Sequence, residues 1–329
     1  MVCIKVPAST ANLGPGFDTL GMALSLFNYI EMIETGSADE LLIEVEGEGA
    51  SSIARDQSNV TWLAAREVFQ IAGRYPTGLL LRQKNKIPSA RGLGSSAAAR
   101  VGGLLAANYL IGEPLNREQL LQLAVRLEGH PDNVAPALLG GLVVACRSDQ
   151  ELVYRQLTVP ERLTVILAIP GFELSTYEAV QALPPKIPLG DAVFNIGQAC
   201  LFITAILTQD WSLIGQAMGD RIHQSYRQRL VPGLSAVIEA ARAAGALGAA
   251  LSGAGPTVLA LALDDQDQIN ANNAEPEEVN TVNRSQQIGK KMQAAFRQHG
   301  VDSIIRILKP WSQGAERIAC SNIKCCSIK

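Results

Sequence analysis

The residues that could do chemistry most directly lie in the segment IPSARGLGSSAAAR, residues 87–100. Gly92 and Gly94 allow positive backbone φ angles and the close approach of a ligand. A helix that begins at Ser95 or Ser96 would present unpaired N–H groups and the positive end of its dipole. Together these features predict a cradle for phosphate groups. A serine hydroxyl in the first helical turn can also reach a magnesium ion that bridges two phosphates.

Two common nucleotide motifs do not describe this loop. A Walker loop has GK[ST] after the last glycine of its run, whereas Ser95 and Ser96 follow Gly94 here. A dinucleotide fingerprint needs a third glycine and an acidic ribose ligand in a βαβ unit, and the sequence has neither in a convincing form. A nicotinamide-dependent oxidoreductase is therefore disfavoured. Because a glycine loop before a helix is common, the loop alone does not identify its ligand. The rest of the sequence is needed to predict what the loop binds.

Periodicity and capping residues predict the elements that hold the loop. The first thirty residues and the segment 41–49 are rich in strand signals. Asn59 is a plausible N-cap for a helix that Gly73 ends, and Asn116 with Gln119 resembles a capping box. Further elements are expected as a strand at 77–83, a buried helix at 95–110, a helix at 117–129 and a loop at 128–133.

The second half of the sequence predicts a small domain of helices packed on strands. Strands are expected at 140–146 and 163–169, with Pro160 near a domain boundary, helices at 176–183, 190–208 and 233–244, and two strands around a glycine turn at 248–263. This alternation is typical of the α+β class. We expect two domains, residues 1–158 and 159–329, with a solvated polar loop at 264–284.

Composition excludes several classes of function. The chain of 329 residues has 28 basic and 31 acidic residues, so it offers no net positive field for nucleic acid or an anionic membrane. We expect a cytoplasmic protein, because no secretory signal or membrane span is evident. Cys3, Cys146 and Cys200 are expected to be small buried hydrophobes. Three further cysteines are expected in an exposed tail that does not bind metal: Cys320, Cys325 and Cys326.

The string PxxxGLGSSAA resembles the phosphate loop of the GHMP kinases. Three other segments resemble that family in the same order: PASTANLGPGFDTLGMAL at 7–24, EGHPDNVAPALLGGLVV at 128–144 and LSGAGPTVLAL at 251–261. Within the family, NLGPGFDTLG and HxDNVAP are similar to the homoserine kinase branch. The resemblance implies an N-terminal domain like the second domain of ribosomal protein S5 and a ferredoxin-like C-terminal domain. ATP and the substrate would meet in the cleft between them.

The resemblance also implies which residues bind Mg-ATP. Ser96 and Glu128 match the magnesium pair of the family, one hydroxyl and one carboxylate. Phosphoryl transfer requires little covalent work from the protein beyond cradling phosphates, holding a metal and placing the acceptor oxygen in line. The expected nucleotide-binding residues are Asn59, Pro88, Ser89, Ala90, Arg91, Gly92, Leu93, Gly94, Ser95, Ser96, Ala97 and Ala98.

The same resemblance implies an amino-acid substrate, L-homoserine, phosphorylated on its side-chain hydroxyl for threonine synthesis. Asp18 can accept from an α-ammonium group, and Arg227 matches an arginine that forks onto the α-carboxylate. The expected substrate-binding residues are Asn12, Asp18, His130, Asp132, Arg227 and Gly253, and the expected catalytic residues are Ser96, Glu128, Asp132 and Asn133. Whether Asp132 abstracts the hydroxyl proton or only positions the hydroxyl stays open at this point.

Two departures from the family pattern keep alternatives open. Val180 stands where homoserine kinases commonly carry a second carboxylate-binding arginine, and the C-terminal residues 313–329 look unrelated and are not expected to pack. One alternative is a kinase for another small hydroxylated metabolite. The other is a nucleotide-binding regulator that has lost phosphoryl transfer. A homodimer is a further possibility that the sequence does not decide.

Overall fold

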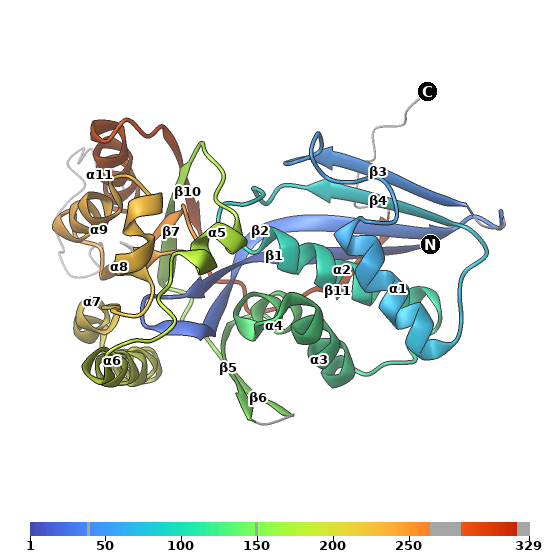
Figure 1. Cartoon of the computed structure of the whole chain (residues 1–329), viewed down its shortest axis with the longest axis horizontal. Coiled ribbons are helices and arrows are strands. Elements are labelled where there is room, and N and C mark those ends of the chain that lie inside the picture. The colour runs from blue at the N-terminus through green and yellow to red at the C-terminus, as the bar shows by residue number, and fades with distance from the viewer. Residues whose placement is uncertain (38–39, 149–150, 264–283, 321–329) are drawn as a thin grey trace, which may run out of the picture.

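The computed structural model describes residues 1–37, 40–148, 151–263 and 284–320, which form two β-sheets with helices packed on them (Figure 1). The first sheet has the order β11-β1-β2-β4-β3, with β5 paired to β2 and β6 paired to β5. Its long central hairpin is β1 and β2, and its parallel pair is β3 and β4. The strands are β1 (Val2–Asn12), β2 (Gly16–Glu34), β3 (Leu41–Gly47), β4 (Leu79–Asn85), β5 (Leu142–Ser148), β6 (Glu151–Leu157) and β11 (Glu316–Arg317).

Helices α1 to α4 lie together on the first sheet (Figure 1). The central helix α2 packs on β1 and β2, and its Gly102 and Gly103 face Ile30 and the Thr61 carbonyl so closely that an added Cβ would clash. Asn59 caps α1 and Gly73 ends it, and the capping box of Asn116 opens α3, as predicted. The bounds are α1 (Val60–Ala72), α2 (Ser95–Leu110), α3 (Arg117–Glu128) and α4 (Pro131–Leu139).

The predicted loop at 128–133 is mostly helical. Glu128 is the last residue of α3, and after Gly129 and His130 the helix α4 begins at Pro131. Proline favours the first helical position because its fixed φ suits a helix and no N–H partner is needed there. Asp132 and Asn133 therefore lie in the first turn of a helix.

The second sheet has the order β10-β7-β9-β8, with antiparallel neighbours. Helices α9 and α11 pack on it around a separate apolar core. Along the chain these elements follow in the order β7, α9, β8, β9, α11 and β10. This βαββαβ arrangement confirms the expected ferredoxin-like fold of the second domain. The bounds are β7 (Leu163–Pro170), β8 (Gly248–Leu251), β9 (Val258–Leu263), β10 (Ser303–Leu308), α9 (Leu234–Ala243) and α11 (Arg284–Gln298). Most of the predicted loop at 264–284 lies outside the described residues, and its last residue begins α11.

Four helices connect β7 to α9: α5 (Thr176–Gln181), α6 (Leu189–Thr208), α7 (Ile214–Ala217) and α8 (Gln224–Arg227). Among the described residues, α6 alone is long and apolar enough to cross a membrane by length and composition, and 22% of its most apolar stretch is buried in the fold. Asn195, near its middle, donates hydrogen bonds to the Pro15 carbonyl (3.2 Å) and the Asp220 carboxylate (2.7 Å). The inner face of α6 is therefore part of the folded domain.

The C-terminal segment returns to the first sheet. Glu316 and Arg317 pair with β1, and Ile318 donates a backbone hydrogen bond to Cys3 (2.9 Å). The expectation that residues from 313 onward do not pack is therefore wrong for this stretch, whereas Cys325 and Cys326 lie outside the described residues. The division at residue 158 stays a prediction, although β11 belongs to the sheet of the first half.

The expected burial of the cysteines holds for one of the three. Cys3 is buried, whereas Cys146 at the end of β5 and Cys200 on α6 are exposed. Cys146 lies on the narrow β5–β6 extension of the sheet, and Cys200 lies on the outer face of its helix, so neither position is covered by a second layer.

Candidate active site

Three distant segments are hydrogen-bonded together at the base of the candidate site. The Thr10 and Ser252 hydroxyls lie 2.8 Å apart, and the Ser252 hydroxyl donates to the Gly92 carbonyl (2.6 Å). The Asn12 amide donates to the Gly253 carbonyl (3.0 Å). The end of β1, the glycine loop and the turn between β8 and β9 are thus fixed relative to one another, which places three of the four sequence motifs at one position.

The glycine loop has the conformation that its sequence predicts. Gly92 and Gly94 have φ angles of 71° and 70°, a region that side chains rarely adopt. An added Cβ on Gly92 would lie 2.1 Å from the Ser252 carbonyl oxygen, and one on Gly94 would lie 2.1 Å from the Ser9 hydroxyl. Gly94 is also the N-cap of α2 and supplies no side-chain hydrogen bond. The first N–H groups of α2 therefore have no side-chain cap, as a phosphate site requires.

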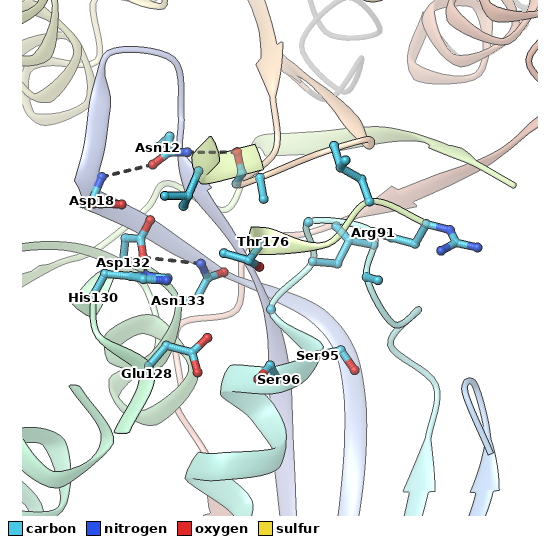
Figure 2. Close-up of a pocket in the computed structure, with 18 of the residues that line it drawn as sticks. Asn12, Asp18, Arg91, Ser95, Ser96, Glu128, His130, Asp132, Asn133 and Thr176 are labelled. Carbon is cyan, nitrogen blue, oxygen red and sulfur yellow. Dashed lines mark hydrogen bonds and ion pairs between the residues drawn. The ribbon is translucent and has the colours of Figure 1, made fainter. Parts of the chain in front are cut away.

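A cavity of about 280 Å³ opens in front of this loop (Figure 2). The residues that line it come from the first domain, from the segment after β7 and from the β8–β9 turn. They include Asn12, Asp18, Ala90, Arg91, Gly92, Leu93, Gly94, Ser95, Ser96, Glu128, His130, Asp132, Asn133, Thr176, Val180, Arg227 and Gly253. The structure therefore brings all the predicted substrate-binding and catalytic residues to one cavity.

Some predicted nucleotide-binding residues lie elsewhere. Asn59 is buried, and its side chain accepts from Thr61 and Trp62 as a helix cap, accepts from Gln83 (2.8 Å) and donates to Ala54 (2.7 Å). Its amide is therefore committed to holding α1. The other predicted residues outside the cavity are Pro88 and Ser89, which line a neighbouring hollow of about 260 Å³, and Ala97 and Ala98, which are buried in the first turn of α2.

Arg91 connects the glycine loop to the second domain. Its guanidinium donates to the carbonyls of Pro170 (3.0 Å), Gly171 (2.9 Å) and Ser89 (3.1 Å). Glu173 lies 3.5 Å from the same group. Three carbonyls and a carboxylate thus hold this cation at the cavity wall, so it fixes the loop against the end of β7.

Ser96 and Glu128 face each other across one side of the cavity (Figure 2). Between them lies Arg100, one turn further along α2, whose guanidinium contacts the Ser96 hydroxyl and forms a 2.6 Å ion pair with Glu128. Burial raises the pKa of Glu128, and the Arg100 charge opposes that shift. A hydroxyl and a carboxylate are hard oxygen ligands that suit magnesium, and a cationic side chain already lies between them. The two residues therefore fit a metal ion.

His130, Asp132 and Asn133 form a hydrogen-bonded group at the start of α4. The His130 Nδ1 contacts the Asp132 carboxylate, and the Asn133 amide oxygen accepts from the Ser9 hydroxyl (3.0 Å). Burial lowers the pKa of His130, but the hydrogen bond and charge of Asp132, with smaller effects of Asp18 and Glu128, outweigh it and bring the pKa to about 9. His130 is therefore a cation at neutral pH that is held by Asp132.

Asp18 completes a polar cluster with this group. Its carboxylate, the Asp132 carboxylate and the His130 ring place one ligand atom each within 4.8 Å of one another. Burial in the cavity wall and the Asp132 charge raise the pKa of Asp18. Two carboxylates and one imidazolium leave a net negative charge, so the cluster can accept a further cation. Asn12 orients Asp18 by accepting from its backbone N–H (3.2 Å).

Arg227 is a buried guanidinium that also lines the cavity. It donates to the carbonyls of Gly253 (3.0 Å) and Ala179 (3.3 Å), and burial lowers its pKa. His223 lies 3.2 Å from it through Nδ1 and contacts the Gly14 carbonyl through Nε2 (2.8 Å). These partners require a proton on Nε2 and none on Nδ1, and burial lowers the pKa of His223, so the neutral ring accepts from Arg227.

Three further residues at the site were not predicted from the sequence: Arg100, Thr176 and His223. His223 is the N-cap of α8 and Arg227 is its last residue, and this spacing of four residues is a signal that could have linked them. Thr176 begins α5 and lines the cavity near Asn133 (Figure 2). It lies one turn before Val180, which is 49% exposed and also lines the cavity.

Comparison with known proteins agrees with this geometry. The family models that describe the GHMP kinase N-terminal and C-terminal domains match residues 59–141 and 202–277. A homoserine kinase from Moorella thermoacetica is 46% identical over 315 residues, which is 96% of this chain and 99% of that protein. One from Aquifex aeolicus is 42% identical and spans 82% of this chain and 89% of that protein.

Solved structures agree as well. The crystal structure of a homoserine kinase from Cytophaga hutchinsonii superposes with a TM-score of 0.82 at 30% identity, over 96% of this chain and 97% of that chain. A mevalonate kinase from L. major, solved with R-mevalonate, has a TM-score of 0.67 over 94% and 96% of the two chains, and at 18% identity it shows a shared fold only. The chain belongs to the GHMP kinase family, in its homoserine kinase group.

Proposed function

We propose that this chain transfers the γ-phosphoryl group of ATP to the side-chain hydroxyl of L-homoserine, giving O-phospho-L-homoserine for threonine synthesis. The observation that carries the proposal is the pair of oppositely charged anchors in one cavity. Arg227 offers a guanidinium for an α-carboxylate, and the cluster around Asp18 accepts an α-ammonium group. An amino acid bound between them can present its side chain to the glycine loop.

The glycine loop is the proposed phosphate site. Backbone N–H groups from Gly92 to Ser96 and the N-terminus of α2 would bind the phosphates, because they have no side-chain cap. Ser96 and Glu128 would hold Mg²⁺, with Arg100 moving away from them. Bound there, the ion would neutralise charge on the phosphates during transfer.

Asp132 is proposed to position the acceptor hydroxyl. It lies at the start of α4, where the helix dipole favours its negative charge, and His130 fixes one of its oxygens. A loose phosphoryl-transfer transition state demands little deprotonation beforehand, so orientation of the hydroxyl contributes more than removal of its proton.

We also propose that the protein works in the cytoplasm.

ADP release with Mg-ATP and a panel of acceptors tests the proposal. The panel contains homoserine, serine, threonine, mevalonate and galactose. We expect turnover that is selective for homoserine. Selective turnover of another acceptor would point to a different hydroxylated metabolite. The reason to test other acceptors is Val180, which stands in place of a second carboxylate-binding arginine. Binding of ATP without turnover of any acceptor would identify a nucleotide-binding regulator.

A further inference from the structure

One buried histidine contacts both parts of the chain that are proposed to hold the substrate. His223 is fully buried and is the N-cap of α8. Its Nδ1 accepts from the guanidinium of Arg227 (3.2 Å), and its Nε2 donates to the carbonyl of Gly14 (2.8 Å). Gly14 lies between β1 and β2, in residues 12–18, which we call the substrate turn. One imidazole ring therefore joins the carboxylate anchor to the turn that carries Asp18.

The substrate turn depends on contacts from outside itself. Three of its residues with side chains have positive φ angles of 69°, 49° and 53°: Asn12, Leu13 and Asp18. Such values are uncommon for these residues, so the surrounding structure has to hold them. Besides the bond from His223, Asn195 on α6 donates to the carbonyl of Pro15 (3.2 Å). The ring of Phe17, the neighbour of Asp18, stacks on the ring of His223 with their centroids 5.4 Å apart.

Arg227 is held by three acceptors, and His223 is one of them. The Nε of Arg227 donates to the carbonyl of Ala179 (3.3 Å), and Nη1 donates to the carbonyl of Gly253 (3.0 Å) and to His223. A guanidinium has five N–H donors, so two remain on Nη2. No described residue accepts from Nη2, and Arg227 lines the cavity. The three acceptors thus fix which edge of the guanidinium is left for a carboxylate.

We propose that His223 is a positioning residue, which fixes the separation between Arg227 and Asp18 so that both can bind one α-amino acid. The ammonium and carboxylate groups of an α-amino acid share one carbon atom, so the groups that bind them must keep one separation. The proposal rests on the proposed function, because only an amino-acid substrate uses both anchors. Among the described residues, His223 is not one that lines the cavity. It therefore acts through Arg227 and the substrate turn.

Both bonds require a neutral ring with its proton on Nε2. Burial and the charge of Arg227 lower the pKa of His223, whereas the charges of Asp220 and Asp132 oppose that shift. The Asp220 carboxylate lies 3.7 Å from Nε2. It already accepts from the side chain of Asn195 (2.7 Å) and from three backbone N–H groups around the start of α8. With four other donors, this carboxylate does not hold a second proton on the ring.

Two substitutions separate the two bonds of His223. In His223→Gln, the amide nitrogen can take the place of Nε2 and donate to Gly14, but nothing replaces Nδ1 as the acceptor for Arg227. In His223→Asn, the amide oxygen can take the place of Nδ1, but the shorter side chain does not reach Gly14. The first variant therefore loosens the carboxylate anchor, and the second loosens the substrate turn.

Calorimetric titration with three ligands reads the two anchors separately. His223→Gln should raise Kd about tenfold for homoserine and for 4-hydroxybutyrate, which has no ammonium group, because about one charge-assisted hydrogen bond is lost. Its Kd for 3-aminopropan-1-ol, which has no carboxylate, should hardly change. His223→Asn should raise Kd for homoserine and 3-aminopropan-1-ol and spare 4-hydroxybutyrate. The kcat for homoserine should change less than Kd, because His223 contacts neither the acceptor hydroxyl nor the glycine loop.

His299→Gln is the matched control, because the Nδ1 of His299 contacts the Ala295 carbonyl (3.0 Å) outside the cavity. It should leave all three Kd values unchanged. A role in packing alone would weaken all three ligands together in both variants at position 223. That result, or unchanged homoserine binding in both variants, would overturn the proposal. The crossed pattern without homoserine turnover by the wild type would support the positioning role and contradict the proposed function.

The tautomer can be measured without a change at position 223, so variants that do not fold leave the proposal open to refutation. The chain has three histidines, and His130→Gln and His299→Gln assign two of their imidazole signals. In the wild-type chain labelled with ¹⁵N-histidine, NMR at pH 7 should show a neutral His223 with its proton on Nε2. A protonated ring, or a proton on Nδ1, would exclude the bond from Arg227 and overturn the proposal.

Discussion

Arg100 and Glu128 form a 2.6 Å ion pair at the edge of the cavity, and the same guanidinium contacts the hydroxyl of Ser96. One cationic side chain thus lies between the two residues that we propose as magnesium ligands. Arg100 has 23% of its side chain exposed, so it has room to move outward. It would compete with the metal ion for the same oxygens.

Arg100→Met should therefore lower the Mg²⁺ concentration needed for half-maximal ATP binding. The expected change is about three- to tenfold, because a partly exposed ion pair contributes only about 1 kcal/mol. Isothermal titration with ATP at several Mg²⁺ concentrations measures it. Arg126→Met is the matched control, because Arg126 pairs with Glu67 outside the cavity. Weaker ATP binding with an unchanged Mg²⁺ requirement would show instead that Arg100 contacts phosphate.

Ser96→Ala and Glu128→Gln should each reduce kcat by about 100-fold, as removal of a group that stabilises transition-state charge commonly does. Both changes leave the apolar core intact, so thermal unfolding should move little. The double variant should lose less than the product of the two single losses, because both residues act through one ion. Multiplicative losses, or normal turnover of either single variant, would contradict a shared metal site.

Asp132→Asn should raise KM for homoserine and lower kcat without removing an acidic limb from the pH profile of kcat. The amide can still occupy the place beside His130, but it loses the charge that orients the acceptor hydroxyl. Steady-state kinetics across the pH range measures both effects. Disappearance of an acidic limb from the kcat profile would identify Asp132 as a true general base.

The pKa of His130, about 9 against an ordinary value of 6.5, predicts a pH dependence of stability. A group with a raised pKa in the folded state stabilises the protein fully below pH 6.5, and that contribution is lost as the pH rises through 9. His130→Gln should therefore flatten the fall in unfolding free energy between pH 6.5 and 9. Urea unfolding at each pH measures the slope. An equal slope in both proteins would place the imidazole pKa near its ordinary value.

Val180→Arg should lower KM for homoserine by roughly ten- to hundredfold, because a charge-assisted hydrogen bond contributes about 1.5–3 kcal/mol. Val180 is half-exposed and lines the same cavity as Arg227, so a longer side chain has space to reach a carboxylate there. We expect kcat to change less than KM. A homoserine analogue without the carboxylate is the control and should gain nothing. An unchanged KM would favour a substrate that has no carboxylate at this position.

The sequence was sufficient to predict those parts of the fold that local chemistry determines. The caps at Asn59 and Asn116 and the glycine loop before α2 depend on residues close together in the chain, and all formed as predicted. Asn59 shows the limit of that reasoning. The one side-chain amide of Asn59 could either cap α1 or contact the nucleotide. The structure shows that it caps α1 and accepts a hydrogen bond from Gln83.

Other features depend on contacts between distant residues. Arg100 has no motif of its own, and its position matters only because α3 ends beside α2 and brings Glu128 to it. The pairing of Arg317 with Ile4 joins residues more than 300 positions apart, which no local pattern predicts. The exposure of Cys200 likewise follows from which face of α6 the domain covers.

The pairing of β11 with β1 has a consequence for how the protein is made. β1 leaves the ribosome well before its neighbour on one side, β11, which lies at Glu316–Arg317. At synthesis rates of about 5–20 residues per second, that edge stays open for roughly a quarter of a minute to a minute. An open edge offers unpaired backbone groups to other chains. A nascent or truncated chain that lacks residues 309–317 therefore leaves this edge of β1 open to pairing with other chains.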